Sequence, residues 1–392
     1  MMFKEANILS AMQPLYFISK LCGLTPYSYV ELLNNTYVIK GPSAPITIWT
    51  LTVTIFVVAG YIHNLIYLFQ QTKYHTASSS VVIIFEKTWL FAFSVSILLL
   101  GLTRNRLKVQ NILQYILEIE QNILKNTAGN IYKKTFCSLS FQVLFVSGFH
   151  VCMLYSYIKI HNGKDNFACQ FSYTIASFVN TIAVIQFLFL LEILRYSCKN
   201  IGEELEHSEI NYLKINNVFI VRNIHDIPQP RQQSNKLHHL RSLHFKLYEL
   251  AELINSCYGF LMLIETTHNF VMVVGLMRDI LTALEEKSDT NLVIRNICLL
   301  IFYSAKETMI LRTSQVTKNK SKEILVIVHK LLLHPNVDQE CETQLRLFAG
   351  QIVDNKFQFT ACGIFPLDLS TLHSIVAAAA TYIIILYQMK NA

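Results

Sequence analysis

Charged side chains are scarce in this sequence. Asp, Glu, Lys and Arg make up only 15% of its 392 residues, whereas hydrophobic residues make up 52%. A soluble globular protein usually carries about 25% charged residues. The deficit argues against a soluble globular domain and favours a polytopic membrane protein.

The motifs of common enzyme classes are also missing. The sequence has no glycine-rich phosphate loop, no His-Glu-x-x-His pair and no Gly-x-Ser-x-Gly turn. Two His-x-x-x-Asp patterns begin at His161 and His334, which is what chance gives among 13 histidines. We therefore expect no catalytic site and do not expect the protein to be an enzyme.

The nine cysteines form no CxxC pair and no Cys/His spacing typical of a zinc site. We expect neither a disulfide framework nor a bound metal or cofactor. No positively charged start with an apolar run and a small-residue cleavage site precedes the first long apolar segment. That segment is therefore expected to direct insertion itself, rather than follow a removed signal peptide.

Long apolar runs are what the sequence does contain. A helix needs about 20 apolar residues to cross the ~30 Å core of a bilayer. Seven runs approach that length: 46–69, 81–101, 136–158, 171–194, 256–279, 292–311 and 368–388. The sixth has the weakest resemblance to a membrane span, because Arg295, Lys306 and Glu307 lie within it. The fold class predicted is an all-α membrane protein with seven transmembrane helices.

The distribution of basic residues predicts the orientation in the membrane. Most of the 33 Lys and Arg residues fall in the N-terminus and after the second, fourth and sixth spans. Because basic residues collect on the cytosolic side, the N-terminus is expected in the cytosol and Ala392 outside. This orientation is opposite to that of a G-protein-coupled receptor, and the Asp-Arg-Tyr and Asn-Pro-x-x-Tyr motifs are absent where such a receptor has them. No G protein is expected as a partner.

The cytosolic side is expected to be a packed helical anchor base rather than a set of loops. Leu237, Leu240, Leu243, Leu247, Leu250 and Ile254 form an apolar stripe at helical spacing before the fifth span. Such a stripe needs a partner surface, which the other cytosolic helices can provide. The spans are therefore expected to extend below the bilayer.

The expected organisation follows the chain in order. Its segments are a cytosolic N-terminal segment (1–45), helices one to four (46–194, with an extended cytosolic helix around 104–134), a cytosolic loop with a linker at about 214–235 and an amphipathic helix (195–255), helices five and six (256–311), anchor helices (312–366), a pore-lining seventh helix (367–388) and an extracellular tail (389–392).

The last apolar run carries a narrow stripe of polar and small residues. Ser370, Ser374, Ala377, Thr381 and Gln388 follow one another at steps of three, four or seven residues, and Ile385 completes the repeat. In one interpretation the small residues let another helix approach closely. In the other the stripe faces a water-filled pore. One stripe is too narrow to enclose a pore, so the second interpretation requires several copies around an axis.

The segment FTACGIFPLDLSTLHSIVAAAATYIIILYQ resembles the C-terminus of insect gustatory receptors, whose hallmark is Thr-Tyr, five hydrophobic residues, Gln and Phe. Thr381, Tyr382 and Gln388 match this motif, whereas Met389 stands where the family usually has Phe. LHFKLYELAELINSCYG before the fifth span and MQPLYFISKLCGLTPY near the N-terminus also resemble that family. The resemblance therefore touches the whole chain.

The resemblance implies a non-selective cation channel gated by a small-molecule tastant, in the plasma membrane of sensory neurons. It implies a homotetramer, or a heterotetramer with other gustatory receptor subunits, with the lipid bilayer as surroundings and no nucleic acid as partner. The seventh helix would line the pore, and Gln388 and Met389 would form the gate. An odorant-receptor-type subunit that needs a co-receptor and a membrane transporter are the alternatives. The sequence shows neither the internal repeats nor the broken helices usual in transporters.

The resemblance also places the ligand among the outer halves of helices two to six. Glu265, His268 and Asn269 lie on one face of the fifth span, where a carboxylate is costly unless it is paired or hydrated. They either bond to one another and to neighbouring helices or line a cavity for a hydroxyl- or nitrogen-bearing ligand. Weaker candidates for the pocket are Trp89, His150, Tyr155 and Tyr173, since Tyr and Trp near membrane ends are more often interface anchors. Lys87 and Arg295 could snorkel or pair.

Overall fold

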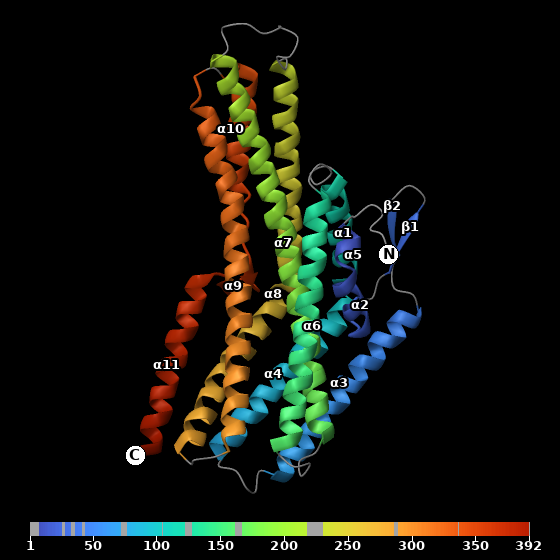
Figure 1. Ribbon diagram of the computed structural model, residues 1–392, viewed down its shortest axis with the longest axis vertical. Helices are drawn as coiled ribbons and strands as arrows, with labels where there is room; N and C mark the ends of the chain where they lie inside the picture. The colour runs from blue at the N-terminus through green and yellow to red at the C-terminus, as the bar shows by residue number, and fades with distance from the viewer. Residues whose placement is uncertain are drawn as a thin grey trace.

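The structure is a computed structural model. It describes residues 8–25, 28–32, 36–40, 44–71, 77–103, 105–121, 128–160, 167–217, 230–285, 289–335 and 337–391. These residues form an elongated bundle of helices whose long axis is vertical in Figure 1. The predicted all-α membrane fold is confirmed.

Eleven helices lie in the described residues. They are α1 (Ile8–Ala11), α2 (Gln13–Leu21), α3 (Ala44–Gln71), α4 (Ala77–Leu102), α5 (Asn105–Ile119), α6 (Ala128–Ile160), α7 (Phe167–Asn217), α8 (Pro230–Glu285), α9 (Thr290–Leu332), α10 (Gln339–Asp354) and α11 (Leu369–Asn391). Two short antiparallel hairpins accompany them, formed by β1 (Ser28–Leu32) with β2 (Thr36–Lys40) and by β3 (Thr360–Ala361) with β4 (Phe365–Pro366). Neither hairpin was predicted from the sequence.

Each of the seven predicted apolar runs falls on one long helix. Among the described residues α3, α6, α7 and α8 are each long and apolar enough to cross a membrane. Helix α4 reaches that standard only together with α5. Helix α9 holds the sixth run with its three charged residues, and α11 holds the seventh. All seven runs are thus helical, as predicted.

Three helices are much longer than a bilayer requires. Helices α7, α8 and α9 have 51, 56 and 43 residues, which at 1.5 Å per residue is about 65–85 Å. Their extensions run together with α10 at the upper end of Figure 1. All six residues of the predicted leucine stripe are buried there, each at most 5% exposed. The helical base is therefore confirmed as a packed unit, although α8 begins at Pro230 and most of the expected linker lies outside the described residues.

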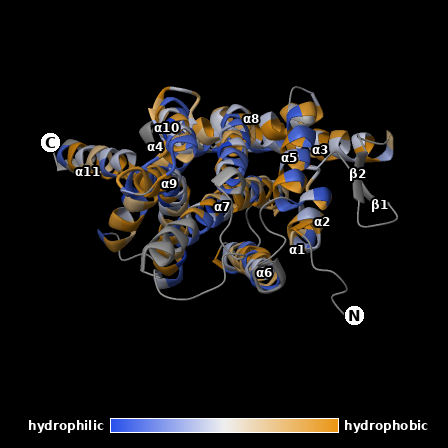
Figure 2. Ribbon diagram, turned by 90° about the horizontal axis from the view of Figure 1, so that it is seen from above, coloured by the Kyte–Doolittle hydropathy of each residue, from blue (hydrophilic) through white to orange (hydrophobic). Residues whose placement is uncertain are grey.

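The ends of α3, α6, α8 and α11 lie at the opposite end of the molecule from the base (Figure 1). This arrangement matches a chain in which every odd-numbered span finishes on one side. Seen from above, α11 and α3 lie at opposite edges and α7 and α8 lie at the centre (Figure 2). The terminal helix therefore has a large surface that the other described residues do not cover.

A buried histidine in the base makes stability depend on pH. The His244 side chain is 0% exposed, and its ring lies 5.6 Å from Phe348 and 5.7 Å from Phe357. Burial lowers the pKa of His244 to about 4, whereas an unfolded histidine has a pKa near 6.5. The unfolded chain therefore binds the proton first as the pH falls. The contribution of neutral His244 to stability is fully present above about pH 6.5 and is lost as the pH falls from about 6.5 to 4.

Replacing His244 by Leu is expected to weaken this acid sensitivity. Between pH 7.5 and 5.0 the wild-type protein should lose about 2 kcal/mol more stability than His244→Leu, the amount set by the pKa difference over that interval. Denaturation of the detergent-solubilised protein at the two pH values measures the difference. An identical pH dependence in both proteins would show that His244 does not cause it.

Candidate functional site

A cavity of about 280 Å³ lies among five helices at the end of the bundle opposite the base. Its lining comes from α4, α6, α7, α8 and α9, near the points where α6 and α8 end and α7 and α9 begin. The volume is close to the lower limit for small-molecule pockets, which span about 300–1,000 Å³. The five helices hold the second to sixth predicted spans, and that a ligand binds among them stays a prediction.

One wall of this cavity is aromatic. The rings of Phe149 on α6 and Phe302 on α9 stack with their centroids 4.2 Å apart. His150 lies edge-on to Phe302 at 5.7 Å, and its Nε2 is 3.3 Å from the hydroxyl of Ser177. A flat ligand can pack against such a wall, while the imidazole and hydroxyl fix its orientation.

The polar groups of the cavity lining are mostly cationic side chains. Among the described residues, Lys87, Arg278 and Arg295 line the cavity together with one carboxylate, that of Asp279. Arg278 donates to Asp279 over 2.7 Å, and Arg295 lies over the ring of Tyr157 at 5.5 Å. The lining therefore carries more positive than negative charge, which favours a ligand rich in hydrogen-bond acceptors or bearing negative charge.

The structure brings some of the predicted ligand residues to this cavity and not others. His150 and Tyr173 line it. Trp89 packs against Phe85 and the core, and Tyr155 is 66% exposed on the surface of α6. Arg278 and Asp279 also line the cavity but were not predicted from the sequence. Charged residues at the end of a span are usually interpreted as lying at the membrane–water interface.

The predicted polar group on the fifth span lies between α8 and α9, outside this cavity. Glu265 is 0% exposed and forms an ion pair with Lys306 over 2.5 Å. Asn269 donates from Nδ2 to Glu307 Oε2 over 2.6 Å, and the His268 ring lies edge-on to Tyr303. Of the two interpretations left open, the geometry of Glu265 favours internal pairing. Asn269 also lines a different cavity, described below.

The polar stripe of α11 lies on the face that the other described residues leave uncovered. Leu372 and Ile375 pack against the core, and Ala379 is buried. At about 100° per residue, Ser374 and Thr381 point to the opposite side of the helix from these three. Both are exposed, as are Ser370, Tyr382, Ile385 and Gln388; the side chain of Met389 lies outside the described residues. The hydroxyl groups of Ser374 and Thr381 donate to the carbonyl oxygens of Ser370 and Ala377 one turn earlier, over 3.2 and 2.9 Å.

The start of α11 is fixed to the bundle through the β3–β4 hairpin. Asn255 of α8 accepts a hydrogen bond from the Thr360 amide over 2.8 Å, and Gln315 of α9 accepts one from Leu369 over 2.9 Å. Gly259 of α8 lets the hairpin backbone approach, because a Cβ there would lie 3.1 Å from the Thr360 carbonyl oxygen. Two segments that resemble gustatory receptors, around residues 255–259 and 359–368, therefore contact each other.

Substituting Gly259 by Ala is expected to strain this contact. The added methyl group must push the hairpin away by a few tenths of an ångström, at a cost of about 1–3 kcal/mol in stability. Gly148→Ala in α6 is the matched control, because a Cβ there meets nothing within 4 Å. Thermal unfolding in detergent should show Gly259→Ala less stable than Gly148→Ala, and equal melting temperatures would contradict the close approach.

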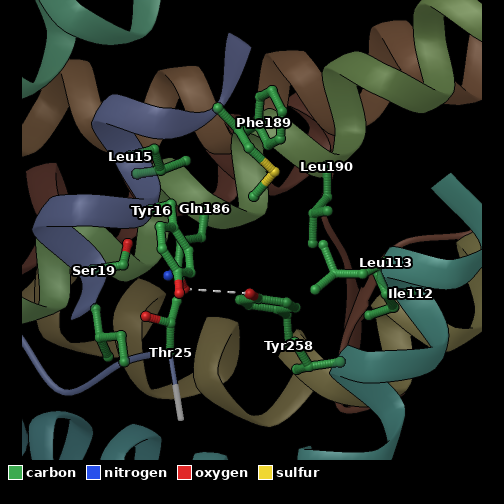
Figure 3. Close-up of a pocket in the computed structure, with 13 residues that line it drawn as sticks. Leu15, Tyr16, Ser19, Thr25, Ile112, Leu113, Gln186, Phe189, Leu190 and Tyr258 are labelled. Carbon is green, nitrogen blue, oxygen red and sulfur yellow. Dashed lines mark hydrogen bonds between the residues drawn. The ribbon is translucent and has the colours of Figure 1, made fainter. Parts of the chain in front are cut away.

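A smaller cavity of about 50 Å³ lies at the junction of α2, α5, α7 and α8 (Figure 3). The Tyr258 hydroxyl donates to Gln186 across it over 3.5 Å. The buried hydroxyls of Ser19 and Thr25 have no hydrogen-bond partner among the described residues. This space suits one or two water molecules and is too small for an organic ligand.

Comparison with known proteins agrees with this architecture. Residues 12–392 match the model of a family described as 7tm chemosensory receptor. The candidate gustatory receptors 28a and 28b of Drosophila melanogaster are 37% identical over 93 residues and 33% identical over 94 residues. These matches cover 23% and 24% of this chain and only 20% of each relative.

The fold as a whole is similar to that of a solved insect receptor. The olfactory receptor OR5 of Machilis hrabei superposes with a TM-score of 0.69 at 13% identity, covering 97% of this chain and 98% of that one. The same receptor in complex with eugenol gives a TM-score of 0.68 at the same identity and coverage. At this identity the likeness concerns the fold alone.

Proposed function

The chain belongs to the 7tm chemosensory receptor family, and on that premise we propose that it is an insect gustatory receptor in which a tastant opens the protein's own cation pore. Four subunits surround a central axis, each contributing α11 to the pore wall. The ligand binds in the 280 Å³ cavity of each subunit. The receptor acts in the plasma membrane of sensory neurons, without a G protein and without a catalytic step.

The exposed polar stripe of α11 is the observation that carries this proposal. Its hydroxyl groups and the Gln388 amide lie on the side of the helix that the subunit leaves uncovered. Facing one another across an axis, four such stripes provide the polar lining that hydrated cations need. Thr381 and Ser374 line this pore, and Gln388 and Met389 stand at its gate together with Ile385.

The cationic lining of the cavity supports a particular class of tastant. In the described lining, three cations (Lys87, Arg278 and Arg295) accompany one carboxylate, Asp279, which favours a small aromatic or oxygen-rich molecule with a carboxylate or similar anionic group. The ring would pack on the wall made by Phe149 and Phe302. The eugenol bound by the Machilis receptor is also small, but that pocket belongs to another chain.

Arg295→Gln is expected to reduce the affinity for such a ligand. Phenylacetate is a suitable probe, and 2-phenylethanol is its neutral counterpart. Loss of a charge-assisted hydrogen bond of about 1.5–3 kcal/mol should weaken phenylacetate binding by about 10- to 100-fold and leave 2-phenylethanol nearly unchanged. Ligand-induced thermal stabilisation of the purified protein measures both. Arg312→Gln, on the exposed part of the same helix, is the control.

Recording currents from cells that express the receptor alone tests the proposed function. Ligand-evoked cation currents that persist when G proteins are blocked are the expected result. Currents that vanish under the block would overturn the channel assignment. Currents that appear only with a second receptor would favour the odorant-receptor type of assembly.

A further inference from the structure

A second cavity, of about 310 Å³, separates α11 from the body of the subunit. It lies between α8, α9 and α11, and its volume is within the range of small-molecule pockets. Leu372, Ile375 and Ala379 form the side that belongs to α11, and Phe270 and Val273 belong to α8. The wall is therefore almost entirely apolar, and it includes the same helix face that attaches α11 to its subunit.

Two buried acceptors stand in this apolar wall. Asn269 is 1% exposed and Glu307 is 3% exposed, and both line the cavity. The amide of Asn269 donates to one carboxylate oxygen of Glu307, which leaves Asn269 Oδ1 and Glu307 Oε1 without a hydrogen-bond partner among the described residues. The Thr266 side chain, one turn earlier on α8, is 4% exposed, and its hydroxyl also has no hydrogen-bond partner among the described residues.

Of the two acceptors, the Glu307 carboxylate is the more costly to leave without a partner. Lys306 already forms an ion pair with Glu265, and in the described part of the chain Glu307 has no ion pair within 4 Å. An unpaired carboxylate and an open carbonyl in an apolar wall are costly to bury. A ligand that supplies a hydrogen-bond donor, and above all a positive charge, removes this cost.

From these contacts we infer that this second cavity, distinct from the tastant cavity, binds a small aliphatic molecule headed by an ammonium group. Its alkyl part packs between α11 and the α8–α9 pair, and its head donates to Asn269 Oδ1 and Glu307 Oε1. A lipid acyl chain fits the apolar wall but offers no donor for the two oxygens. Water offers donors but does not fill an apolar space of this volume.

Binding at this site acts on the pore helix directly. Only Ala379 on this face of α11 is fully buried, because the cavity takes up much of the space that packing would fill. A molecule in the cavity therefore changes how α11 sits against its subunit. The effect on currents rests on the proposed channel function, whereas the binding itself does not.

Photolabelling of the purified full-length receptor in lipid nanodiscs tests the binding. The probe is an aliphatic diazirine carrying a primary amine, and labelled residues are identified by mass spectrometry. We expect saturable labelling of α8, α9 and α11 around the cavity, competed by n-hexylamine about tenfold more effectively than by n-hexanol and not at all by n-hexane. Labelling confined to the tastant cavity, or competed equally by hexane, would overturn the proposal.

Two variants test separately the contact of the ligand's ammonium group and the fit of its alkyl part. Glu307→Gln keeps the shape and one acceptor oxygen, so it should abolish the preference for hexylamine over hexanol, a change of about tenfold. Ser304→Phe places a large ring at the cavity wall and should abolish labelling, whereas Ala305→Phe, on the next exposed residue of α9, should not.

Because the readout is labelling, it remains valid if the receptor carries no current. Retained labelling in Ser304→Phe would show that the molecule binds elsewhere. Retained preference for the amine in Glu307→Gln would show that the carboxylate does not hold the head group.

Discussion

Thr381→Lys is expected to abolish most of the cation current while leaving the receptor at the cell surface. Thr381 is exposed on the uncovered face of α11, and in the proposed tetramer four lysines would surround the ion path. A positive charge about 10 Å from a monovalent cation in water opposes it by about 0.4 kcal/mol, so four together amount to about 1.7 kcal/mol. That energy corresponds to a fall in conductance of about fifteenfold, measured by single-channel recording at low ionic strength.

Thr381→Glu is the matched control at the same position. Its side chain is also longer than threonine and charged, but its sign attracts cations, so conductance should rise or stay unchanged. Screening by salt should reduce the difference between the two variants. Equal loss of current in both would indicate a packing defect, and unchanged current in both would show that Thr381 does not face the pore.

Lys306→Met is expected to cause the largest loss of stability. Lys306 is 8% exposed, and it forms an ion pair with Glu265, which is 0% exposed. Removing the only cation of a buried pair leaves an uncompensated carboxylate, which typically costs about 3–5 kcal/mol. The methionine preserves most of the volume and the contact with Tyr303, so the effect should come from charge. Thermal unfolding in detergent should show a melting temperature several degrees lower.

The double variant Glu265→Gln/Lys306→Met separates charge from packing. With both members of the pair neutral, no buried charge is left unpaired at position 265, and most of the lost stability should return. Unfolding of the single and double variants is compared under the same conditions. Additive destabilisation would mean that the ion pair does not couple the two residues.

The features that could be predicted from sequence depend on periodicity. The leucine stripe before the fifth span follows helical spacing, and its burial in the base required no knowledge of the partner helices. The stripe on α11 is a second case, since residues three or four apart share a face in any helix. Spans of apolar residues long enough to cross a membrane are visible for the same reason.

The features that could not be predicted depend on contacts between distant segments. Glu265 could have been paired or could have lined a cavity, and only the approach of α9, which brings Lys306 beside it, favours pairing. Arg278 and Asp279 resemble interface residues until α9 brings Arg295 to the same cavity. The β3–β4 hairpin was missed because each strand has two residues, too short for an alternating pattern.

The central claim is that the uncovered polar face of α11 lines the pore, and thiol accessibility tests it most directly. Ser374→Cys and Thr381→Cys are each expressed and treated with a charged, membrane-impermeant methanethiosulfonate reagent during ligand application, with Leu372→Cys on the packed face as the control. If α11 lines the pore, modification blocks the current of the first two variants and leaves the current of Leu372→Cys unchanged. Cysteines at 374 and 381 that stay unmodified while cations flow would contradict it.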